Sequence, residues 1–383
     1  MRRIGVGLAG LALVAVAAGC GSGSDGGGES LPSQTASPTP SKLDVSGIVV
    51  LDTQTGDPDD VSGDAAWRLR VFDPDTGKNT MNLAIPLAAA DHDPNGFSAR
   101  PEPWTAARGS FSSDWQYFAY NWNGSIYILK LDAASRSYTP KATVKADTGS
   151  YSGGEVSYDQ PRFSRAGHRL WFSASPEQGS TKLESVDYTA PGKPREEATL
   201  KRSRGNLDTR WRLTAGGKVT QYVQTPKGGD FGTWTLYGPD GKAAEKARTQ
   251  NGNKVSYVMA DGKVAGGALE TDENRYRLID TIGDHTMLVH IVGLGGFANQ
   301  DEQLLSVHVD PGSGRAKVQT VAKAGAEKLL GAALAPDHER AVLLTRGGFY
   351  IKKLGTSSEP QPFRKSAGDE RDAYGPYVLG WTK

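Results

Sequence analysis

One short stretch of the chain has the residue types and spacing of a metal-binding loop. Asp91-His92-Asp93-Pro94-Asn95-Gly96, followed by Glu102, fits the calcium-loop pattern D-x-[DN]-x-[DN]-G-x5-E. Oxygen ligands at alternating positions can converge on one hard cation, and the glycine permits the sharp bend that this requires. The candidate calcium ligands are therefore Asp91, Asp93, Asn95 and Glu102.

The surroundings of this loop support a second interpretation. No helical pattern flanks it, Pro94 and Pro101 stiffen its backbone, and Ser98 replaces the usual apolar residue. The alternative is a polar, proline-rich surface connection between two groups of strands. Both interpretations stay open, so we assign no metal ligand, and calcium is the one cofactor considered.

We find no arrangement typical of a catalytic site and assign no catalytic residue. There is no Gly-x-Ser-x-Gly motif, and the only cysteine, Cys20, lies near the N-terminus. No two histidines have the spacing of a zinc motif. We expect three of them in solvent-facing turns (His168, His285 and His338) and two inside strands (His290 and His308), and His92 falls in the loop above.

Two further polar stretches have ordinary explanations. One group of acidic residues is typical of a solvated loop between strands: Asp52, Asp57, Asp59, Asp60 and Asp64. The glycines of Gly293–Gly296 precede no helix, so they do not form a phosphate-binding turn.

The composition favours a protein made of strands and turns. The 383 residues include 48 glycines and 21 prolines, which is high for a helical protein. The 44 basic and 43 acidic residues give a net charge of +1, so nucleic acid is not an expected partner. Beyond Cys20 there is no cysteine, and stability must come from a buried core rather than from disulfides.

The N-terminus has the pattern of an export signal. Arg2 and Arg3 precede the apolar run Ile4–Ala18, and small residues lead directly to Cys20. This segment resembles the lipobox of bacterial lipoproteins, in which the cysteine is diacylated and becomes the first mature residue. Ala17 departs from the usual Leu or Val of that motif. The alternative is an ordinary secretory signal with a cysteine there by chance.

A tether is expected to follow the signal. Residues 1–19 form the predicted signal peptide, and residues 20–44 comprise the lipidated Cys20 and a Gly/Ser/Pro-rich segment with almost no bulky apolar side chain. Such a segment cannot bury enough surface to offset its ordering entropy. The resemblance implies that acyl chains on Cys20 anchor residues 45–383 at the outer, extracytoplasmic face of the cell membrane.

The rest of the chain consists of repeats of one strand-turn-strand unit. In Gly109–Asp132 we expect three short strands, the first ending at Phe111 and the others at Tyr117–Asn121 and Ile126–Leu131. Alternating apolar residues predict strands that are buried on one face, and Asn123-Gly124 is a strong signal for a hairpin turn. Further copies are Gln160–Asp187, Arg210–Tyr237, a copy that starts at Tyr276, and Leu330–Leu354, with a hairpin of uncertain membership at Lys254–Leu269.

Repeated units of roughly 45–55 residues with about four strands each predict a single all-β propeller domain. The apolar strand faces then pack between blades, so we assign Trp171, Trp211, Trp234 and Trp381 to the core. The first unit lacks its opening strand, whereas Tyr377–Trp381 forms a strand with no unit after it. Pairing of the two would close the ring. The turns predict six or seven blades, with seven slightly favoured.

The repeat resembles the WD40-like repeat of TolB-type propellers. Phe111-Ser112-Ser113-Asp114 and Phe163-Ser164-Arg165-Ala166-Gly167 match it best, and Pro336-Asp337 keeps part of it. The resemblance implies the fold much more than the function.

Two functions fit the residues themselves, and a third, assistance to envelope assembly or secretion, is implied only by the resemblance to TolB-type propellers. The first is a lipid-anchored module, without enzymatic activity, whose propeller binds a protein, peptide or glycan of the cell envelope. The alternative is a calcium-dependent hydrolase or lyase that acts at the mouth of the central tunnel.

Overall fold

The structure is a computed structural model that describes much of the chain after residue 41. The described residues are 42–52, 66–86, 108–122, 124–146, 156–165, 167–176, 180–200, 210–213, 217, 219–226, 232–237, 243–247, 254–258, 264–268, 276–282, 286–291, 303–310, 316–323, 329–345, 347–365 and 377–382. Cys20 and all four candidate calcium ligands lie outside these ranges.

The described part is all-β, as predicted. Its one helical element is the 3-10 turn η2 (Arg108–Ser110). The largest sheet contains β1 (Gly47–Asp52), β2 (Ala66–Phe72), β3 (Asn79–Pro86), β4 (Tyr117–Trp122), β5 (Ser125–Asp132), β6 (Ser137–Val144) and β25 (Tyr377–Thr382). Two four-stranded sheets follow: β7 (Val156–Phe163), β8 (Arg169–Pro176), β9 (Lys182–Asp187) and β10 (Arg195–Thr199), then β11 (Arg210–Leu213), β12 (Val219–Pro226), β13 (Gly232–Tyr237) and β14 (Ala243–Ala247).

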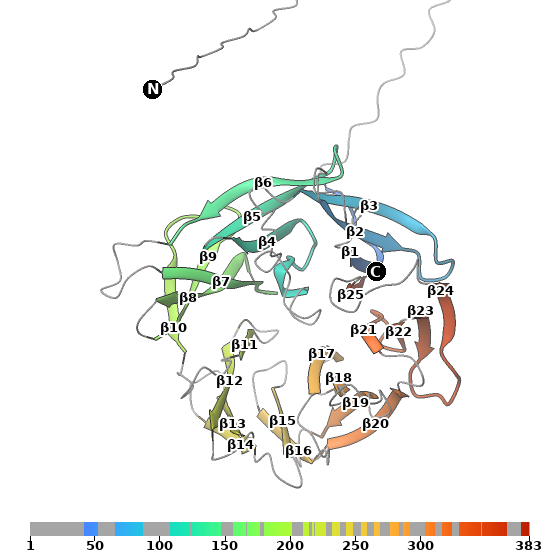
Figure 1. Cartoon of the computed structure of the whole chain (residues 1–383). Helices are drawn as coiled ribbons and strands as arrows, with labels where there is room; N and C mark the ends of the chain where they lie inside the picture. Colours follow the sequence, from blue (N-terminus) through green and yellow to red (C-terminus); the bar gives the residue numbers. More distant parts are fainter. Residues whose placement is uncertain are drawn as a thin grey trace, which may run out of the picture. The chain divides into compact units, whose positions relative to one another are not determined.

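The remaining strands form one short sheet and two four-stranded sheets. The short one pairs β15 (Lys254–Val258) with β16 (Val264–Ala268). The others comprise β17 (Tyr276–Ile282), β18 (Thr286–Ile291), β19 (Gln303–Val309) and β20 (Ala316–Lys323), then β21 (Leu329–Leu334), β22 (Arg340–Thr345), β23 (Gly348–Lys353) and β24 (Gln361–Lys365). In each four-stranded sheet, strands that are consecutive in the chain pair antiparallel, which is the topology of a propeller blade (Figure 1).

The first two repeats are not separate sheets, which differs from the prediction of independent four-stranded units. β3 and β6 pair in parallel at Ala84 and Ser137, and the N–H of Ala84 donates to the carbonyl of Arg136 (3.1 Å). The order of the resulting seven-stranded sheet is β25-β1-β2-β3-β6-β5-β4. The pairing joins two strands that would otherwise each have an open edge there.

The opening repeat has the expected turns but less strand than expected. Phe111 makes only an isolated bridge to Phe118 and is preceded by η2 instead of a strand. Gly124 has φ +69°, the left-handed conformation that the predicted hairpin requires. β4 is also buried on both faces, because Phe118, Ala119 and Tyr120 are all buried. The alternating pattern alone predicted burial on one face only.

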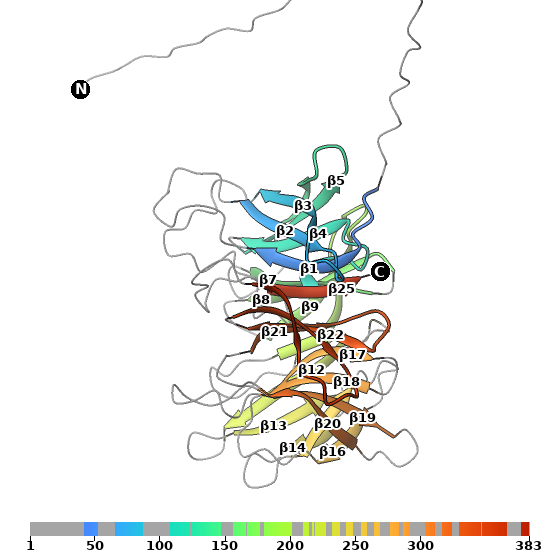
Figure 2. The same ribbon diagram turned by 90° about the vertical axis from the view of Figure 1, so that its right-hand side faces the viewer.

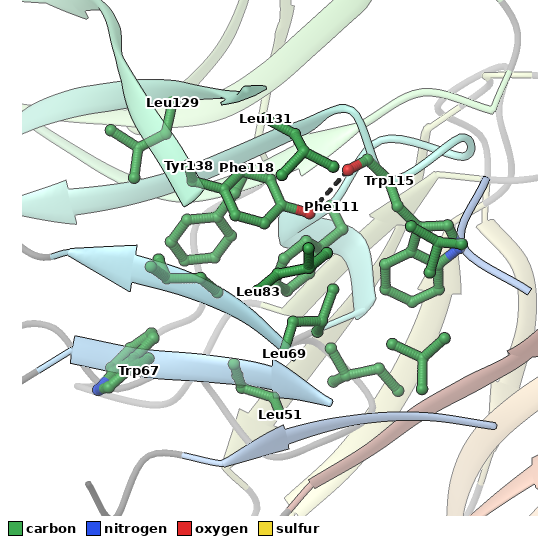
Figure 3. Close-up of a cluster of buried hydrophobic side chains, with 14 of the residues drawn as sticks. Leu51, Trp67, Leu69, Leu83, Phe111, Trp115, Phe118, Leu129, Leu131 and Tyr138 are labelled. Carbon is green, nitrogen blue, oxygen red and sulfur yellow. Dashed lines mark hydrogen bonds between the residues drawn. The ribbon is translucent and has the colours of Figure 1, made fainter. Parts of the chain in front are cut away.

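Aromatic side chains fill the core beneath this repeat (Figure 3). The ring of Phe111 lies 4.6 Å from Phe118 and 5.5 Å from Trp115, measured between centroids. The hydroxyl of Tyr138, which is fully buried, donates to the carbonyl of Trp115 (2.7 Å). Leu69 and Leu83 of the first repeat pack into the same cluster, so the two repeats share one core.

The two ends of the described chain lie side by side. β25 pairs antiparallel with β1, with Trp381 opposite Ile48, which is the strand pairing that the sequence predicts. Figure 2 shows β25, in dark red, beside β1, in blue. The side chain of Thr382 also accepts from the N–H of Gly47 (3.1 Å) and donates to the carbonyl of Val45 (2.6 Å).

The point at which the N-terminal segment enters the first sheet is fixed by two contacts. The side-chain amide of Gln116 donates to the carbonyl of Leu43 (3.1 Å), and the ammonium of Lys42 lies 3.0 Å from Asp114. Within the described ranges, no helix combines the length and the apolar character needed to span a membrane.

The tryptophans assigned to the core lie there where their side chains are described. Trp211 is buried against Leu183, with half-buried Trp171 beside it. Trp381 packs with Ala333 and Val342, so it links β25 to the sheet of β21–β24. Only the backbone of Trp234, in β13, is described.

Candidate functional site

The edge strand β7 of the first four-stranded sheet, β7–β10, has an irregularity that gathers charged groups. Asp159 pairs with Ser173 and Arg162 with Trp171, so Gln160 and Pro161 both stand opposite a single residue of β8. Proline has no N–H to donate to a neighbouring strand, and a bulge is where a strand can accommodate it. Pro161 therefore explains why the bulge forms here.

The bulge places two charged side chains on one face of the sheet. Asp159 and Arg162 are three residues apart and would alternate in a regular strand. Their partners Ser173 and Trp171 are two residues apart and share a face, and cross-strand partners point the same way. Asp159 and Arg162 consequently both face the side of the sheet that holds Trp171.

Burial changes the acid–base behaviour of this carboxyl. Desolvation raises the pKa of Asp159, and this outweighs the hydrogen bond from the N–H of Gln160 (2.7 Å) and the charge of Arg162, both of which lower it. A raised pKa beside a specific charged partner is a recognised mark of functional sites, although structural networks produce it too.

The backbone at the bulge is strained. Gln160 has φ +54°, a left-handed conformation that is unusual for a residue with a side chain and that also precedes a proline. Such strain costs on the order of 1–3 kcal/mol and persists only where the surroundings over-determine it, which is most often at binding or catalytic sites.

Two other segments meet β7 at the bulge. The guanidinium of Arg162 lies over the indole of Trp211 in β11, 5.1 Å from the ring centroid, and its side chain packs against Gly109 of η2. The indole Nε1 of Trp211 is buried and has no hydrogen-bond partner among the described residues. We refer to Asp159, Gln160, Arg162 and Trp211 as the β7 bulge cluster.

The chemistry of the β7 bulge cluster suits recognition. A guanidinium stacked on an indole offers planar donors for a carboxylate, a phosphate or a backbone carbonyl. Asp159 can accept hydrogen bonds when ionised and donate one when protonated. Arginine and tryptophan are also the residue types most enriched where binding energy concentrates.

A neighbouring arginine has a structural role instead. Arg108 of η2 lies 4.0 Å from the ring centroid of Trp115 and donates to the carbonyls of Phe111 and Ser112. These contacts hold the turn that follows Phe111, in which Trp115 has φ +60°.

The histidines that the structure describes are not gathered at a site. His168 and His338 are exposed in turns, as predicted, and Nδ1 of His168 lies 3.2 Å from the hydroxyl of Tyr188. His308 is exposed on β19, and His290 lies within β18. His92 and His285 lie outside the described residues.

The predicted acidic group is described only at Asp52. Its carboxylate lies 2.7 Å from the guanidinium of Arg70 on the paired strand, so it belongs to an ion pair of β1 and β2. The other four aspartates of that group and Gly293–Gly296 lie outside the described ranges. Across the described residues, no group of histidine, cysteine, aspartate and glutamate could hold a metal ion.

Sequence reasoning missed the β7 bulge cluster although one signal was present. Asp159-Gln160-Pro161-Arg162 places a proline at the start of the predicted repeat Gln160–Asp187, and a proline in a strand indicates a bulge or an edge. The partner Trp211 comes from the next sheet, about 50 residues along the chain, and no local pattern joins the two.

Comparisons with known proteins place the chain in no family. No family model and no curated protein matches it. The solved structures that resemble it are β-propeller proteins. A hypothetical selenium-binding protein from Sulfolobus tokodaii is 11% identical, with 83% of this chain and 73% of the other covered and a TM-score of 0.40.

Two further structures are similar at the same level. TolB from Acinetobacter baumannii is 15% identical over 81% of this chain and 61% of its own, with a TM-score of 0.41. A periplasmic gluconolactonase from Pseudomonas aeruginosa is 13% identical over 80% of this chain and 77% of its own, with a TM-score of 0.37. Similarity of this degree identifies neither a substrate nor a partner.

Proposed function

We propose that this chain is a lipoprotein anchored at Cys20 to the outer face of the cell membrane, and that its β-propeller binds a partner of the cell envelope without catalysing a reaction. The observation that carries the binding role is the β7 bulge cluster. There, a strained backbone holds a desolvated carboxyl and a stacked guanidinium where three segments of the chain meet.

The proposed fold is one propeller of seven blades. The first blade is β25 with β1–β3, and the second is the Phe111 bridge with β4–β6. The three complete sheets that begin with β7, β11 and β17, the short β15–β16 sheet and the sheet of β21–β24 supply the rest. Pairing of β25 with β1 would close the ring, as in the TolB-type propellers that the repeat resembles.

The anchor is supported by the order of features along the N-terminal sequence. A charged start, an apolar run, small residues and Cys20 are followed by a segment that is too polar to fold. The contacts of Lys42 with Asp114 and of Leu43 with Gln116 mark where that tether would reach the domain.

The anchor is tested by labelling cells with a clickable palmitate analogue. The protein should carry the label and remain with the membrane fraction, and Cys20→Ala should abolish both properties. A protein that is exported and released without label, with Cys20 intact, would point to the ordinary secretory signal instead.

The binding role is tested by crosslinking in the intact envelope followed by affinity purification. We expect a partner that is enriched with the natural chain and at least about tenfold less with Arg162→Ala, as for the loss of an interface arginine. Arg68→Ala, an exposed arginine on β2, is the matched control and should retain the partner. If no partner is enriched, or if both variants lose it equally, the assignment fails.

A further inference from the structure

A second polar site lies on the face of the β7–β10 sheet that is opposite the β7 bulge cluster. A cavity of about 560 Å³ opens between the end of β6 and the strands β9 and β10, a volume within the usual range for small-ligand sites, roughly 300–1,000 Å³. Its walls come from two repeats and from the turn that joins β9 to β10. We call it the β6–β9 groove.

The charged side chains of the groove come from three separate segments. Lys145 follows β6, Lys182 begins β9, and Lys193 lies in the turn before β10, whereas Glu184 and Glu196 stand opposite each other on β9 and β10. Among the described residues, no arginine lines the cavity. The lining therefore carries three cations and two carboxylates.

Both carboxylates already have close donors. The hydroxyl of Tyr158 donates to the carboxylate of Glu184 (3.0 Å), and the ammonium of Lys182 donates to that of Glu196 (2.7 Å). Glu184 is only 7% exposed. These bonds fix the floor of the groove and offset part of its negative charge. Lys145 and Lys193 stand on its two walls and are both exposed. The described lining of the groove therefore has more cationic than anionic groups, which suits an anionic ligand.

We propose that the β6–β9 groove binds a phosphate-bearing ligand, with Lys145 and Lys193 as its cationic contacts. Lysine ammoniums are compact point charges with three donors each, and they are established contacts for phosphate groups. The phosphate could belong to a free small molecule or to a phospholipid headgroup. This inference does not depend on the anchor or on the β7 bulge cluster.

Two variants separate binding from folding. Lys145→Ala combined with Lys193→Ala removes the proposed contacts at exposed positions. Gly192→Trp fills the groove, because a Cβ on Gly192 meets no atom within 4 Å and its φ lies outside the left-handed range. Lys141→Ala is the control, since this exposed lysine lies on β6 four residues before Lys145 but does not line the cavity.

The first experiment titrates the full chain carrying Cys20→Ser with glycerol 3-phosphate at constant ionic strength. A single-site ligand should raise the unfolding midpoint in a saturable way. We expect the double lysine variant to raise the dissociation constant by at least about tenfold, as for the loss of charged hydrogen bonds. Gly192→Trp should abolish binding, and Lys141→Ala should leave it unchanged.

The second experiment measures cosedimentation of the same protein with vesicles. Binding to phosphatidylglycerol but not to phosphatidylcholine, lost in the double variant and kept in Lys141→Ala, would identify a headgroup as the source of the phosphate. Binding of glycerol 3-phosphate alone would identify a free ligand. The proposal is overturned if neither probe binds, or if Lys141→Ala weakens binding as much as the double variant.

Discussion

At the scale of single residues, the burial of Asp159 disfavours its ionised form and so costs stability. Desolvation raises the pKa of Asp159, so ionisation of this carboxyl is less favourable in the folded protein than in the unfolded chain. A group with a raised folded pKa reduces stability above its unfolded pKa, and this loss disappears as the pH falls below that value. A residue kept under such conditions is a candidate for a functional role.

Replacing Asp159 with asparagine should therefore stabilise the protein near neutral pH. Asparagine keeps an oxygen to accept from the N–H of Gln160 and carries no charge. We expect a gain of about 0.5–2 kcal/mol at pH 7, the usual size for one stabilising substitution, and a gain that shrinks toward pH 4 and below. Urea unfolding of the two proteins across this range measures it.

Recovery of the envelope partner by Asp159→Asn distinguishes a role of Asp159 in binding from its effect on stability. If the β7 bulge cluster binds the envelope partner, the stabilised variant should recover less partner in the crosslinking experiment. A variant that is less stable at pH 7, or a gain that is constant with pH, would contradict the assigned pKa direction.

At the scale of elements, the turn after Phe111 depends on one buried hydrogen bond. The hydroxyl of Tyr138, on β6, donates to the carbonyl of Trp115, whose φ of +60° places it in the left-handed region. Burial raises the pKa of Tyr138, because desolvation opposes its ionisation, so the hydroxyl stays a donor over the whole physiological range.

The variant Tyr138→Phe should destabilise the protein by about 1–3 kcal/mol, the cost of leaving a buried acceptor without its donor. Tyr127→Phe is the matched control on β5. That ring is half-buried and stacks on Tyr120 with 5.2 Å between centroids, and its change should lie within about 0.5 kcal/mol. Equal effects of the two substitutions in urea unfolding would show that the hydroxyl of Tyr138 contributes nothing specific.

Local patterns predicted the elements better than the contacts between them. The turn at Gly124 follows from φ preferences within a few residues, and the pairing of β25 with β1 follows from a strand missing at one end and present at the other. The parallel contact at Ala84 and the stacking of Arg162 on Trp211 join segments that share no local signal. Cys20 and Asp91–Glu102 lie outside the described residues, so both remain predictions.

At the scale of the whole domain, β25 connects the first and last sheets. Trp381 is 8% exposed, packs with Ile48 of β1 and with Val342 of β22, and has the guanidinium of Arg340 4.9 Å from its ring centroid. Because its contacts belong to both sheets, its loss should weaken both together.

The variant Trp381→Ala should cost about 3–5 kcal/mol, the usual range for truncating a buried aromatic side chain. Hydrogen exchange should then show reduced protection in β1 and also in β21–β23. Trp381→Phe, which keeps most of the apolar contact, should cost clearly less. Reduced protection confined to β1 would mean that the first and last sheets unfold independently.

At this scale, the connection between the first two repeats fits either a calcium loop with Asp91, Asp93, Asn95 and Glu102 as ligands or a polar surface connection. A ligand that binds only the folded state raises stability by RT ln(1 + [L]/Kd), so calcium at about 100 times its dissociation constant would add about 2.7 kcal/mol.

Thermal unfolding of the full chain carrying Cys20→Ser, with calcium or with a chelator, measures this directly. If the loop binds calcium, the midpoint rises and Asp91→Ala abolishes the rise, whereas Asp75→Ala, in an exposed turn between β2 and β3, leaves it intact. That outcome would revive the calcium-dependent enzyme as a rival to the binding module. An unchanged midpoint would leave the loop as a surface connection and direct the search to envelope partners.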